Sequence, residues 1–441
     1  MGRFSHPDPQ SRNSPASLPP AFRRNFVLGV INGILFNVSA ALISTNLVLP
    51  RLIGEYLGGG NVLVGAAAAI DQGGWLLPQL LVGARTQGRA RHLPVYWAAA
   101  VARALCFGGL VVAVALAGQL APPITLALFF AFYTAYSLGA GFAGVAFQEV
   151  VAKTIPPERR GAFFGLRAFG GGLLTLLAVS PAVSFVLGAG SRWGFPTNYA
   201  ILFAAAWVLA LAGLVSFGLV VERPAQQLGR TGSLVVQLRA VPELWRTQPD
   251  LRRFLFYKAL WRLGAIAEPF YIVYAGQSFN MPAALVGEYM AAITVVQLVS
   301  YLVWSRLSDR RGNRLLLRWG SGLAALAPPL ALVLPYLGNL LGLSATTSAY
   351  LFGLVFVISG LGNAGLGIGM GNYILELLPE GDRPAGLGLV NTVTGLIGLL
   401  TILGGTLADF LGYTTLFLIA ATLALGSFVM SLPLVEPRGR A

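Results

Sequence analysis

Residues 285–304 read LVGEYMAAITVVQLVSYLVW, residues 305–314 read SRLSDRRGNR, and residues 315–337 read LLLRWGSGLAALAPPLALVLPYL. Each apolar run is about 20 residues long, the length that an α-helix needs to cross the hydrocarbon core of a bilayer. The connection between them is ten residues long and holds four arginines. The stretch therefore predicts a helical hairpin that crosses a membrane twice, with its charged turn at the membrane surface.

Apolar runs of the same length recur along the whole chain. They fall at residues 26–49, 62–82, 93–117, 124–148, 163–187, 198–221, 254–276, 285–304, 315–337, 349–372, 385–408 and 413–434. Of the 441 residues, 56% are hydrophobic and 10% are charged, whereas soluble domains carry about 25% charged residues. This composition excludes an ordinary soluble enzyme. We predict an all-α integral membrane protein with twelve transmembrane helices.

The net charge of +14 comes mainly from arginines that cluster in the connections between apolar runs. This spacing is typical of the positive-inside rule and excludes a continuous nucleic-acid surface. The rule predicts a multi-pass protein of the plasma or inner membrane with both termini in the cytoplasm. Cys106 is the one cysteine and the chain has two histidines, so we expect no disulfide, metal site or other cofactor.

The connections divide the chain into two halves. We predict a disordered cytoplasmic tail, a six-helix domain, a cytoplasmic linker, a second six-helix domain and a short cytoplasmic tail, at residues 1–22, 23–221, 222–253, 254–434 and 435–441. Apolar residues at helical spacing favour a short amphipathic helix in the linker: Leu234, Leu238, Val241 and Trp245. The alternative for this linker is a solvated charged loop.

The two halves resemble each other in sequence. IPPERRGAFFGL at 155–166 aligns with LPEGDRPAGLGL at 378–389, which matches Arg160 with Arg383. Six crossings return the chain to its starting side, so the pattern predicts a parallel six-plus-six repeat. GAGFAG at 139–144 and GLGNAG at 360–365 fit a nucleotide-binding pattern, but they lie inside apolar runs, and we interpret them as sites of close helix packing.

The connection at 305–314 resembles the loop signature of the major facilitator superfamily. The residues that carry the resemblance are Ser305, Leu307, Asp309, Arg310, Gly312 and Arg314. The equivalent loop of the first half, GARTQGRAR at 83–91, keeps Gly88 but has Arg85 where the second half has Asp309. The resemblance implies two six-helix domains around a central cavity. It also implies a cytoplasmic latch, in which we expect Asp309 to contact Arg310, Arg314 or the loop near Arg383, and Arg85 to face an acid.

Ionisable residues inside spans mark functional sites because they are expensive to bury in lipid. The candidates are Asp71, Arg103, Lys258, Arg262 and Glu268. Polar residues that would line the same cavity are Asn32, Gln72, Gln297 and Tyr301. We expect Asp71 and Arg103 to form a buried pair. Arg167 and Arg318 lie near the ends of their spans and are interpreted as snorkelling to the surface.

The count of buried charges suggests the nature of the solute. If Asp71 pairs with Arg103 and Glu268 pairs with one base of the seventh span, the other base of that span has no acid. This predicts an anionic group on the solute, held by Arg262 with assistance from Lys258. In the alternative, Glu268 neutralises Arg262 and the cavity takes neutral solutes.

Together these features predict a monomeric secondary transporter that moves a small solute by alternating access. Proton coupling through Asp71 or Glu268 is the expected energy source. The alternatives are a uniporter or multidrug exporter, a membrane-embedded enzyme acting on lipid, and a sensor that transports nothing.

Overall fold

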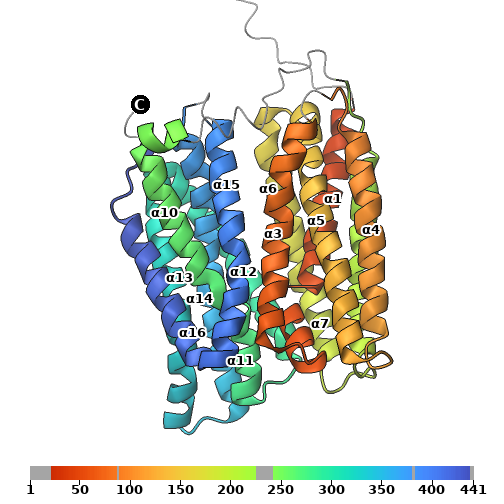
Figure 1. Ribbon diagram of the computed structural model, residues 1–441, viewed down its shortest axis with the longest axis vertical. Helices are drawn as coiled ribbons and strands as arrows, with labels where there is room; N and C mark the ends of the chain where they lie inside the picture. The colour runs from red at the N-terminus through yellow and green to blue at the C-terminus, as the bar shows by residue number, and fades with distance from the viewer. Residues whose placement is uncertain (1–20, 87–88, 225–241, 380–382, 438–441) are drawn as a thin grey trace, which may run out of the picture.

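A computed structural model describes residues 21–86, 89–224, 242–379 and 383–437. Long helices run back and forth between two ends of the molecule (Figure 1). The described chain begins and finishes at the upper end of that view. We use "upper end" and "lower end" in this sense below.

The helices of the first half lie together on one side of Figure 1. They are α1 (Phe22–Leu42), α3 (Gly60–Thr86), α4 (Leu93–Ala115), α5 (Pro122–Thr154), α6 (Pro157–Leu174) and α8 (Thr197–Gly218). A π-helical turn, η3 (Thr175–Val179), continues α6 into α7 (Ser180–Leu187), so these three elements form one crossing. Proline in the first turn of α4, α5 and α6 suits a helix start, where its missing N–H leaves no hydrogen bond unmade.

The second half repeats this order. Its helices are α10 (Pro249–Gly264), α11 (Phe270–Phe279), α12 (Leu285–Arg311), α13 (Asn313–Leu340), α14 (Ala345–Leu377), α15 (Arg383–Leu399) and α16 (Thr401–Ser431). The 3₁₀ turn η4 (Ala265–Ala267) joins α10 to α11 in one crossing. Gly412, with φ 81°, breaks α16 into two pieces, and the first piece completes the crossing that α15 begins.

Among the described residues, nine segments are long and apolar enough to cross a membrane. One of them, Gly386–Ser431, contains the break at Gly412 and therefore makes two crossings. Adding α3 and the α10–α11 pair gives the twelve crossings that the apolar runs predicted. The first crossing is shorter than predicted, because it ends at Leu42, and residues 48–56 form a separate short segment, α2 (Val48–Arg51) with η2 (Leu52–Tyr56).

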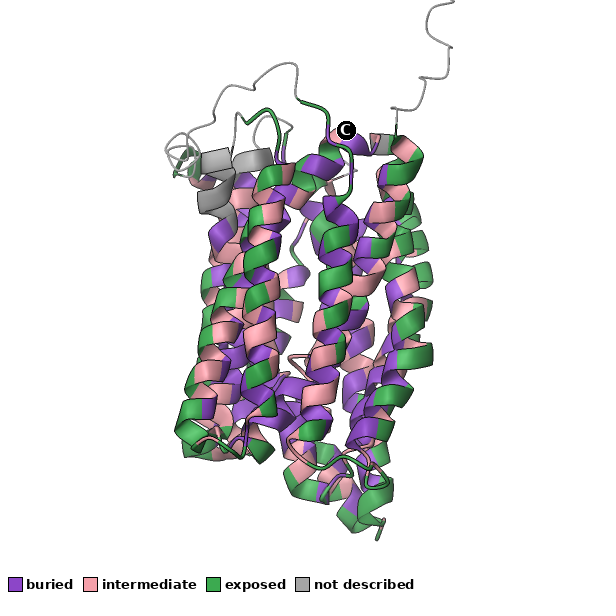
Figure 2. Cartoon of the chain, turned by 90° about the vertical axis from the view of Figure 1, so that its right-hand side faces the viewer, coloured by how far each residue is buried: buried purple, intermediate pink, exposed green. Residues whose placement is uncertain are grey.

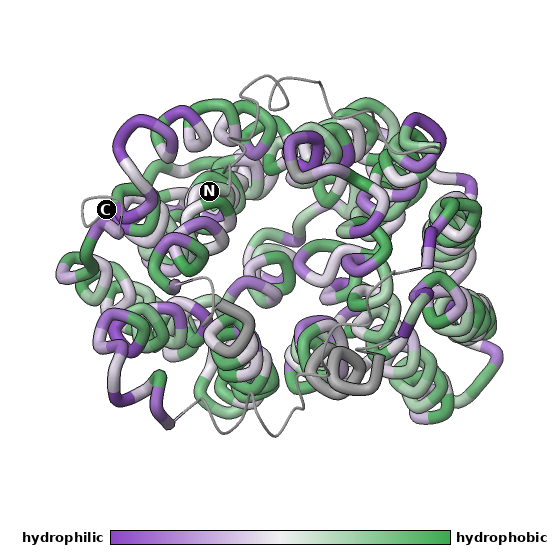
Figure 3. The backbone as a smooth tube through the Cα atoms, turned by 90° about the horizontal axis from the view of Figure 1, so that it is seen from above, coloured by the Kyte–Doolittle hydropathy of each residue, from purple (hydrophilic) through white to green (hydrophobic). Residues whose placement is uncertain are grey.

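Large apolar side chains cover the outside of the helices. Leu105 is 70% exposed and Phe410 is 81% exposed, although water would not tolerate so extensive an apolar surface. Exposed positions follow the outer faces of the helices in Figure 2, and hydrophobic residues predominate on the outward turns in Figure 3. The lipid chains of a bilayer are the medium that suits this surface.

Of the predicted linker, residues 242–247 are helical and α10 already begins at Pro249. The predicted amphipathic helix falls mostly on residues 225–241, which lie outside the described residues, as does the predicted tail at 1–20. The domain boundaries therefore remain predictions.

The two glycine patterns sit at helix contacts, in agreement with the packing interpretation. A Cβ on Gly144 would lie 2.7 Å from the Cη2 atom of Trp75, and one on Gly365 would lie 2.9 Å from the Cε2 atom of Trp304. In each half, therefore, the last glycine of the pattern makes room for a tryptophan of the neighbouring crossing. Gly139 similarly makes room for the stem of Arg103, with 2.6 Å from its Cβ position to Cγ.

A glutamate after the last crossing of each half caps the third crossing of the same half. Glu222 accepts hydrogen bonds from the backbone N–H groups of His92 (2.8 Å) and Leu93 (2.7 Å) at the start of α4, and from Nζ of Lys153 (2.8 Å). Glu436 accepts a hydrogen bond from the backbone N–H of Arg314 (3.0 Å) near the start of α13. A carboxylate at a helix N-terminus satisfies donors that have no partner inside the helix.

Glu222→Gln should lower the stability of the purified protein. Burial of the Glu222 side chain raises its pKa, but the hydrogen bonds from Lys153, His92 and Leu93 outweigh burial and hold the pKa below the usual 4.5. A carboxyl group whose pKa is lowered by folding stabilises the folded state at pH values above its pKa in the unfolded chain. This stabilisation is lost as the pH falls through the pKa of the folded state. Removing a hydrogen-bonded charge of this kind costs about 1.5–3 kcal/mol.

The measurement is the melting temperature in detergent between pH 7 and pH 3.5, with Glu243→Gln, a change at an exposed acid, as the control. The gap between wild type and Glu222→Gln should be widest at pH 7 and should narrow below pH 4.5. A gap that widens on acidification would contradict this account of the cap.

Candidate functional site

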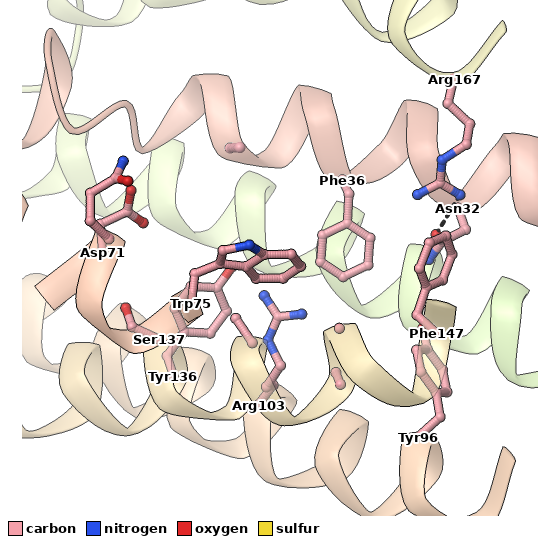
Figure 4. A pocket seen from close by; sticks show the side chains of 15 residues that line it. Asn32, Phe36, Asp71, Trp75, Tyr96, Arg103, Tyr136, Ser137, Phe147 and Arg167 are labelled. Atoms are coloured by element: carbon pink, nitrogen blue, oxygen red, sulfur yellow. Dashed lines mark hydrogen bonds between the residues drawn. The ribbon is translucent and has the colours of Figure 1, made fainter. Parts of the chain in front are cut away.

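Two cavities lie on either side of α1 in the interior of the helical bundle. The larger one, of about 390 Å³, is lined by residues of α1, α3, α4, α5 and α6. We call it the arginine pocket because Arg103 and Arg167 both line it (Figure 4). The second, of about 350 Å³, lies between α1, α6 and α12, and we call it the amide pocket. Its polar lining includes Asn37, Asn46, Thr294, Gln297 and Tyr301.

Arg103 projects from α4 into the arginine pocket between two aromatic rings. Its guanidinium carbon lies 4.7 Å from the ring centroid of Tyr136 and 5.1 Å from that of Phe36. The residue is only 8% exposed. Its Nε is buried without a hydrogen-bond partner. Cation–π attraction is therefore the main interaction that the described residues offer to this charge.

Arg167 lines the other end of the pocket and is held in place by α1. Its Nη1 donates to the backbone oxygen of Gly29 and to Oδ1 of Asn32, the latter at 3.0 Å. Asn32 is itself fixed by a 2.7 Å hydrogen bond from Nδ2 to the backbone oxygen of Gly213. The guanidinium also lies 4.6 Å from the ring centroid of Phe147.

The interpretation of Arg167 as a snorkelling residue was wrong. The apolar run that starts at 163 placed Arg167 near the end of its span, but α6 begins at Pro157. Ten residues further along a helix correspond to about 15 Å, which brings the side chain into the bundle. Phe36, Tyr96 and Phe147 also line the pocket and were not predicted, because an aromatic residue in an apolar helix gives no signal that distinguishes a pocket wall from core.

The predicted pair of Asp71 and Arg103 does not form. Both residues line the arginine pocket, yet no ion pair joins them. In Figure 4, Asp71 lies at the opposite end of the pocket from Arg167, with Trp75 and Arg103 between them. Gln72, the residue that follows Asp71, lies beside Gly398, and so does the guanidinium of Arg262. Matching depth in the membrane was thus a poor guide, because Asp71 and Arg103 project to different parts of the pocket.

Lys258 and Arg262 line neither of the two larger cavities. Arg262 instead lies where the two halves meet: a Cβ on Gly398 of α15 would be 3.4 Å from its Nε and 3.4 Å from Cβ of Gln72 on α3. This position favours a role between the halves over direct contact with a solute in either cavity.

Glu268 receives hydrogen bonds from both halves of the molecule. Asn363 of α14 donates from Nδ2 to Oε1 at 2.8 Å, and Asn46, which follows α1, donates from Nδ2 to Oε2 at 3.4 Å. The carboxylate lies at the break between α10 and α11, beside η4. Gln297 and Tyr301, also predicted as cavity residues, line the amide pocket on α12.

The signature at 305–314 forms the turn between α12 and α13. Gly312 has φ 81°, a conformation that favours glycine, and its α-carbon faces the carboxylate of Glu436. Arg314 donates from Nη2 to the backbone oxygen of Leu432 at 3.3 Å. Leu307 packs on the cluster around Trp304.

The remaining residues of the predicted latch are only partly described. Ser305 bonds to the backbone oxygen of Leu302 in its own helix, and Arg310 occupies the last turn of α12. Arg160 donates to the backbone oxygens of Ile155 and Ala152. Gly88 and the side chains of Arg85 and Arg383 lie outside the described residues, so the contacts of Asp309 across the latch remain a prediction.

Comparison with known proteins agrees with this architecture. Residues 263–441 match the family model of the Major Facilitator Superfamily. A crystal structure of a D-xylose–proton symporter has a TM-score of 0.70 at 16% identity, covering 95% of this chain and 99% of the other. The chain has the major facilitator fold. The resemblance that the signature indicated, and the all-α class with its twelve crossings, are confirmed.

Other solved structures share the fold. The nucleoside transporter NupG gives a TM-score of 0.64 at 15% identity, covering 93% of this chain and 100% of the other. A bacterial homologue of the iron transporter ferroportin, in an inward-facing state, gives 0.65 at 16% identity, covering 93% and 98%. No curated protein sequence matches the chain. The apolar helices and the major facilitator fold make this a multi-pass membrane protein.

Double-mutant cycles should show that Asp71 is coupled to Arg262 more strongly than to Arg103. Residues that interact directly show coupling of about 0.5–3 kcal/mol, and distant residues add independently. The cycles combine Asp71→Asn with Arg262→Gln and with Arg103→Gln, and compare melting temperatures in detergent. Arg318→Gln, a basic change at the upper end, supplies the additive control. Stronger coupling of Asp71 to Arg103 than to Arg262 would contradict this result and support the pair that the sequence predicted.

Proposed function

We propose that the protein is a secondary transporter that moves a small solute across the membrane by alternating access. Two cavities inside the bundle support this proposal, since each is large enough for a small molecule. Charged and amide side chains at membrane depth would replace the water that a polar solute loses on entering. Solute transporters with the same fold strengthen the proposal.

Contacts between the halves at the lower end would close one side of the cavities. Asp409, before the break in α16, accepts hydrogen bonds from Nδ2 of Asn61 (2.7 Å) and from the backbone N–H of Val62 (3.1 Å) at the start of α3. Tyr413 donates to Oδ1 of Asn61 at 2.8 Å. Since the chain ends are expected in the cytoplasm, we infer that this closed end is the outer one and that the structure represents an inward-facing state.

A second contact reinforces the same closure. Arg51 in α2 donates to the backbone oxygen of Met281 at 2.9 Å and to Oε2 of Glu55 at 2.6 Å. The side chain of Arg51 is only 8% exposed, so its hydrogen bond to the second half is shielded from water and strengthened accordingly. The short segment after the first crossing thus serves as a clamp between the halves.

Proton coupling would act through Glu268. Its ionised carboxylate attracts the amide of Asn46 from the first half and that of Asn363 from the second. Hydrogen bonds to a charged acceptor are about twice as strong as neutral ones. Protonation would therefore weaken the link between the halves and favour their separation. Asp71 is the second candidate, because its carboxylate lines the arginine pocket.

Proteoliposomes that contain only this protein provide the test of transport. We expect uptake of at least one solute from a labelled panel, with proton movement reported by an internal pH dye. Glu268→Gln should abolish uptake driven by a pH gradient while exchange of labelled for unlabelled solute continues, because exchange requires no net proton transfer. Glu288→Gln, a change in the first turn of α12, is the control.

The results separate the possibilities. Uptake that ignores the pH gradient would indicate a uniporter and contradict the coupling. Absence of flux for every solute, in protein that is folded and correctly inserted, would contradict transport itself.

Asp409→Ala should shift the protein towards a state that is open at the lower end. The substitution removes the acceptor that holds the start of α3, and each 1.4 kcal/mol changes the ratio of two states about tenfold. The measurement is labelling of a cysteine placed at Gln297 by a membrane-impermeant reagent added outside, in a background where Cys106 is alanine. Glu288→Ala is the control. Labelling that does not increase would show that Asp409 has no part in the closure.

A further inference from the structure

Arg103 is a buried cation whose polar edge is unused by the protein. Among the described residues it makes no ion pair and no hydrogen bond, and its Nε is buried without a partner. An isolated charge at membrane depth is expensive because lipid does not solvate it. A partner from outside the chain would remove part of that penalty.

The surroundings of Arg103 determine which group can reach it. Phe36 and Tyr136 lie over its guanidinium, with the centroids 5.1 and 4.7 Å away. Both contacts set the guanidinium against ring faces, and no described residue accepts a hydrogen bond from the edge formed by its two Nη groups. That edge matches the two oxygens of a carboxylate, which can accept two parallel hydrogen bonds.

The other charges of the pocket do not neutralise Arg103. Arg167 is a second cation and is already bound to Asn32 and to the backbone of Gly29. Asp71 is the one acid among the residues that line the pocket, and it forms no ion pair with Arg103. Two arginines against one acid leave one positive charge, which a monoanion would balance.

The walls of the pocket favour a flat apolar body on that anion. Trp75, Phe36, Tyr136 and Phe147 supply aromatic surface around a volume of about 390 Å³. Aromatic rings attract one another in offset or edge-to-face arrangements, beyond the effect of the area that they bury. Gly144 makes room for the indole of Trp75 on this wall.

We propose that the arginine pocket binds a small aromatic carboxylate whose carboxylate group meets the N–H edge of Arg103. The inference rests on the proposed function in one respect, namely that this pocket holds the transported solute. It places the anion at Arg103 in the first half, in contrast to the sequence-based expectation of Arg262 with Lys258.

The test measures binding to the full chain in detergent, without requiring transport. The probes are radiolabelled benzoate and two competitors: benzamide, which is nearly the same shape without the charge, and acetate, which has the charge without the ring. We expect saturable binding of benzoate, at least tenfold weaker competition by benzamide, and at least tenfold weaker competition by acetate. Charge-assisted hydrogen bonds contribute about 1.5–3 kcal/mol, which corresponds to roughly 10- to 150-fold in affinity.

Three variants locate the site. Arg103→Gln should weaken benzoate binding at least tenfold, and Arg103→Lys should have an intermediate effect because it keeps the charge but loses the planar edge. Trp75→Leu should weaken benzoate and leave acetate competition unchanged. Arg192→Gln, which removes an exposed arginine from a loop at the lower end, is the matched control and should bind as wild type.

The outcomes are decisive in each case. Equal affinities for benzoate and benzamide, undiminished benzoate binding by folded Arg103→Gln, or no saturable benzoate binding by wild type would each overturn the proposal. The wild-type comparison of three probes requires no substitution, so it decides the matter even if Arg103→Gln does not fold. Benzoate binding without flux in proteoliposomes would contradict transport and leave the inference about the pocket standing. Flux of neutral solutes without benzoate binding would support transport and overturn the inference about the pocket.

Discussion

A charge inside a bilayer must find a partner, and this constraint governs the centre of the molecule. Four basic residues lie deep in the bundle, namely Arg103, Arg167, Lys258 and Arg262, against the acids Asp71 and Glu268. Glu268 receives hydrogen bonds from Asn46 of the first half and Asn363 of the second, and Arg262 lies beside Gln72 of the opposite half. Glu268 and Arg262 therefore lie at the boundary between the halves, whereas two of the other three bases, Arg103 and Arg167, line the arginine pocket.

The same pocket exists only because glycines allow helices to approach. Gly139 admits the stem of Arg103, and Gly144 admits the ring of Trp75. Helix packing and the shape of the arginine pocket thus depend on the same positions of α5. A side chain at either glycine would push a functional group of the pocket, so the packing pattern that looked purely structural in the sequence also shapes the site.

Much of the fold could be predicted from the sequence because length and hydrophobicity dictate a membrane-spanning helix without knowledge of neighbours. The twelve crossings, the repeat and the signature around Gly312 follow from such local properties. The pairs that buried charged residues form could not be predicted, because the depth of a residue along a helix does not determine the direction in which its side chain projects. Asp71 and Arg103 have similar depths but form no ion pair. Arg167 was misjudged because its helix begins at Pro157, before its apolar run.

Comparison of the two halves separates the residues that hold the helices together from the charged residues of the arginine pocket. Features at helix ends and contacts occur in both halves: Glu222 and Glu436 cap α4 and α13, and Gly144 and Gly365 each receive a tryptophan. Arg103 has no such counterpart, since the arginines of α13, Arg314 and Arg318, both lie near the start of that helix. Every residue that lines this pocket belongs to the first half. A solute bound there would travel with the first half, while the second half, with Arg262 beside Gln72, would move across the pocket and admit or exclude water.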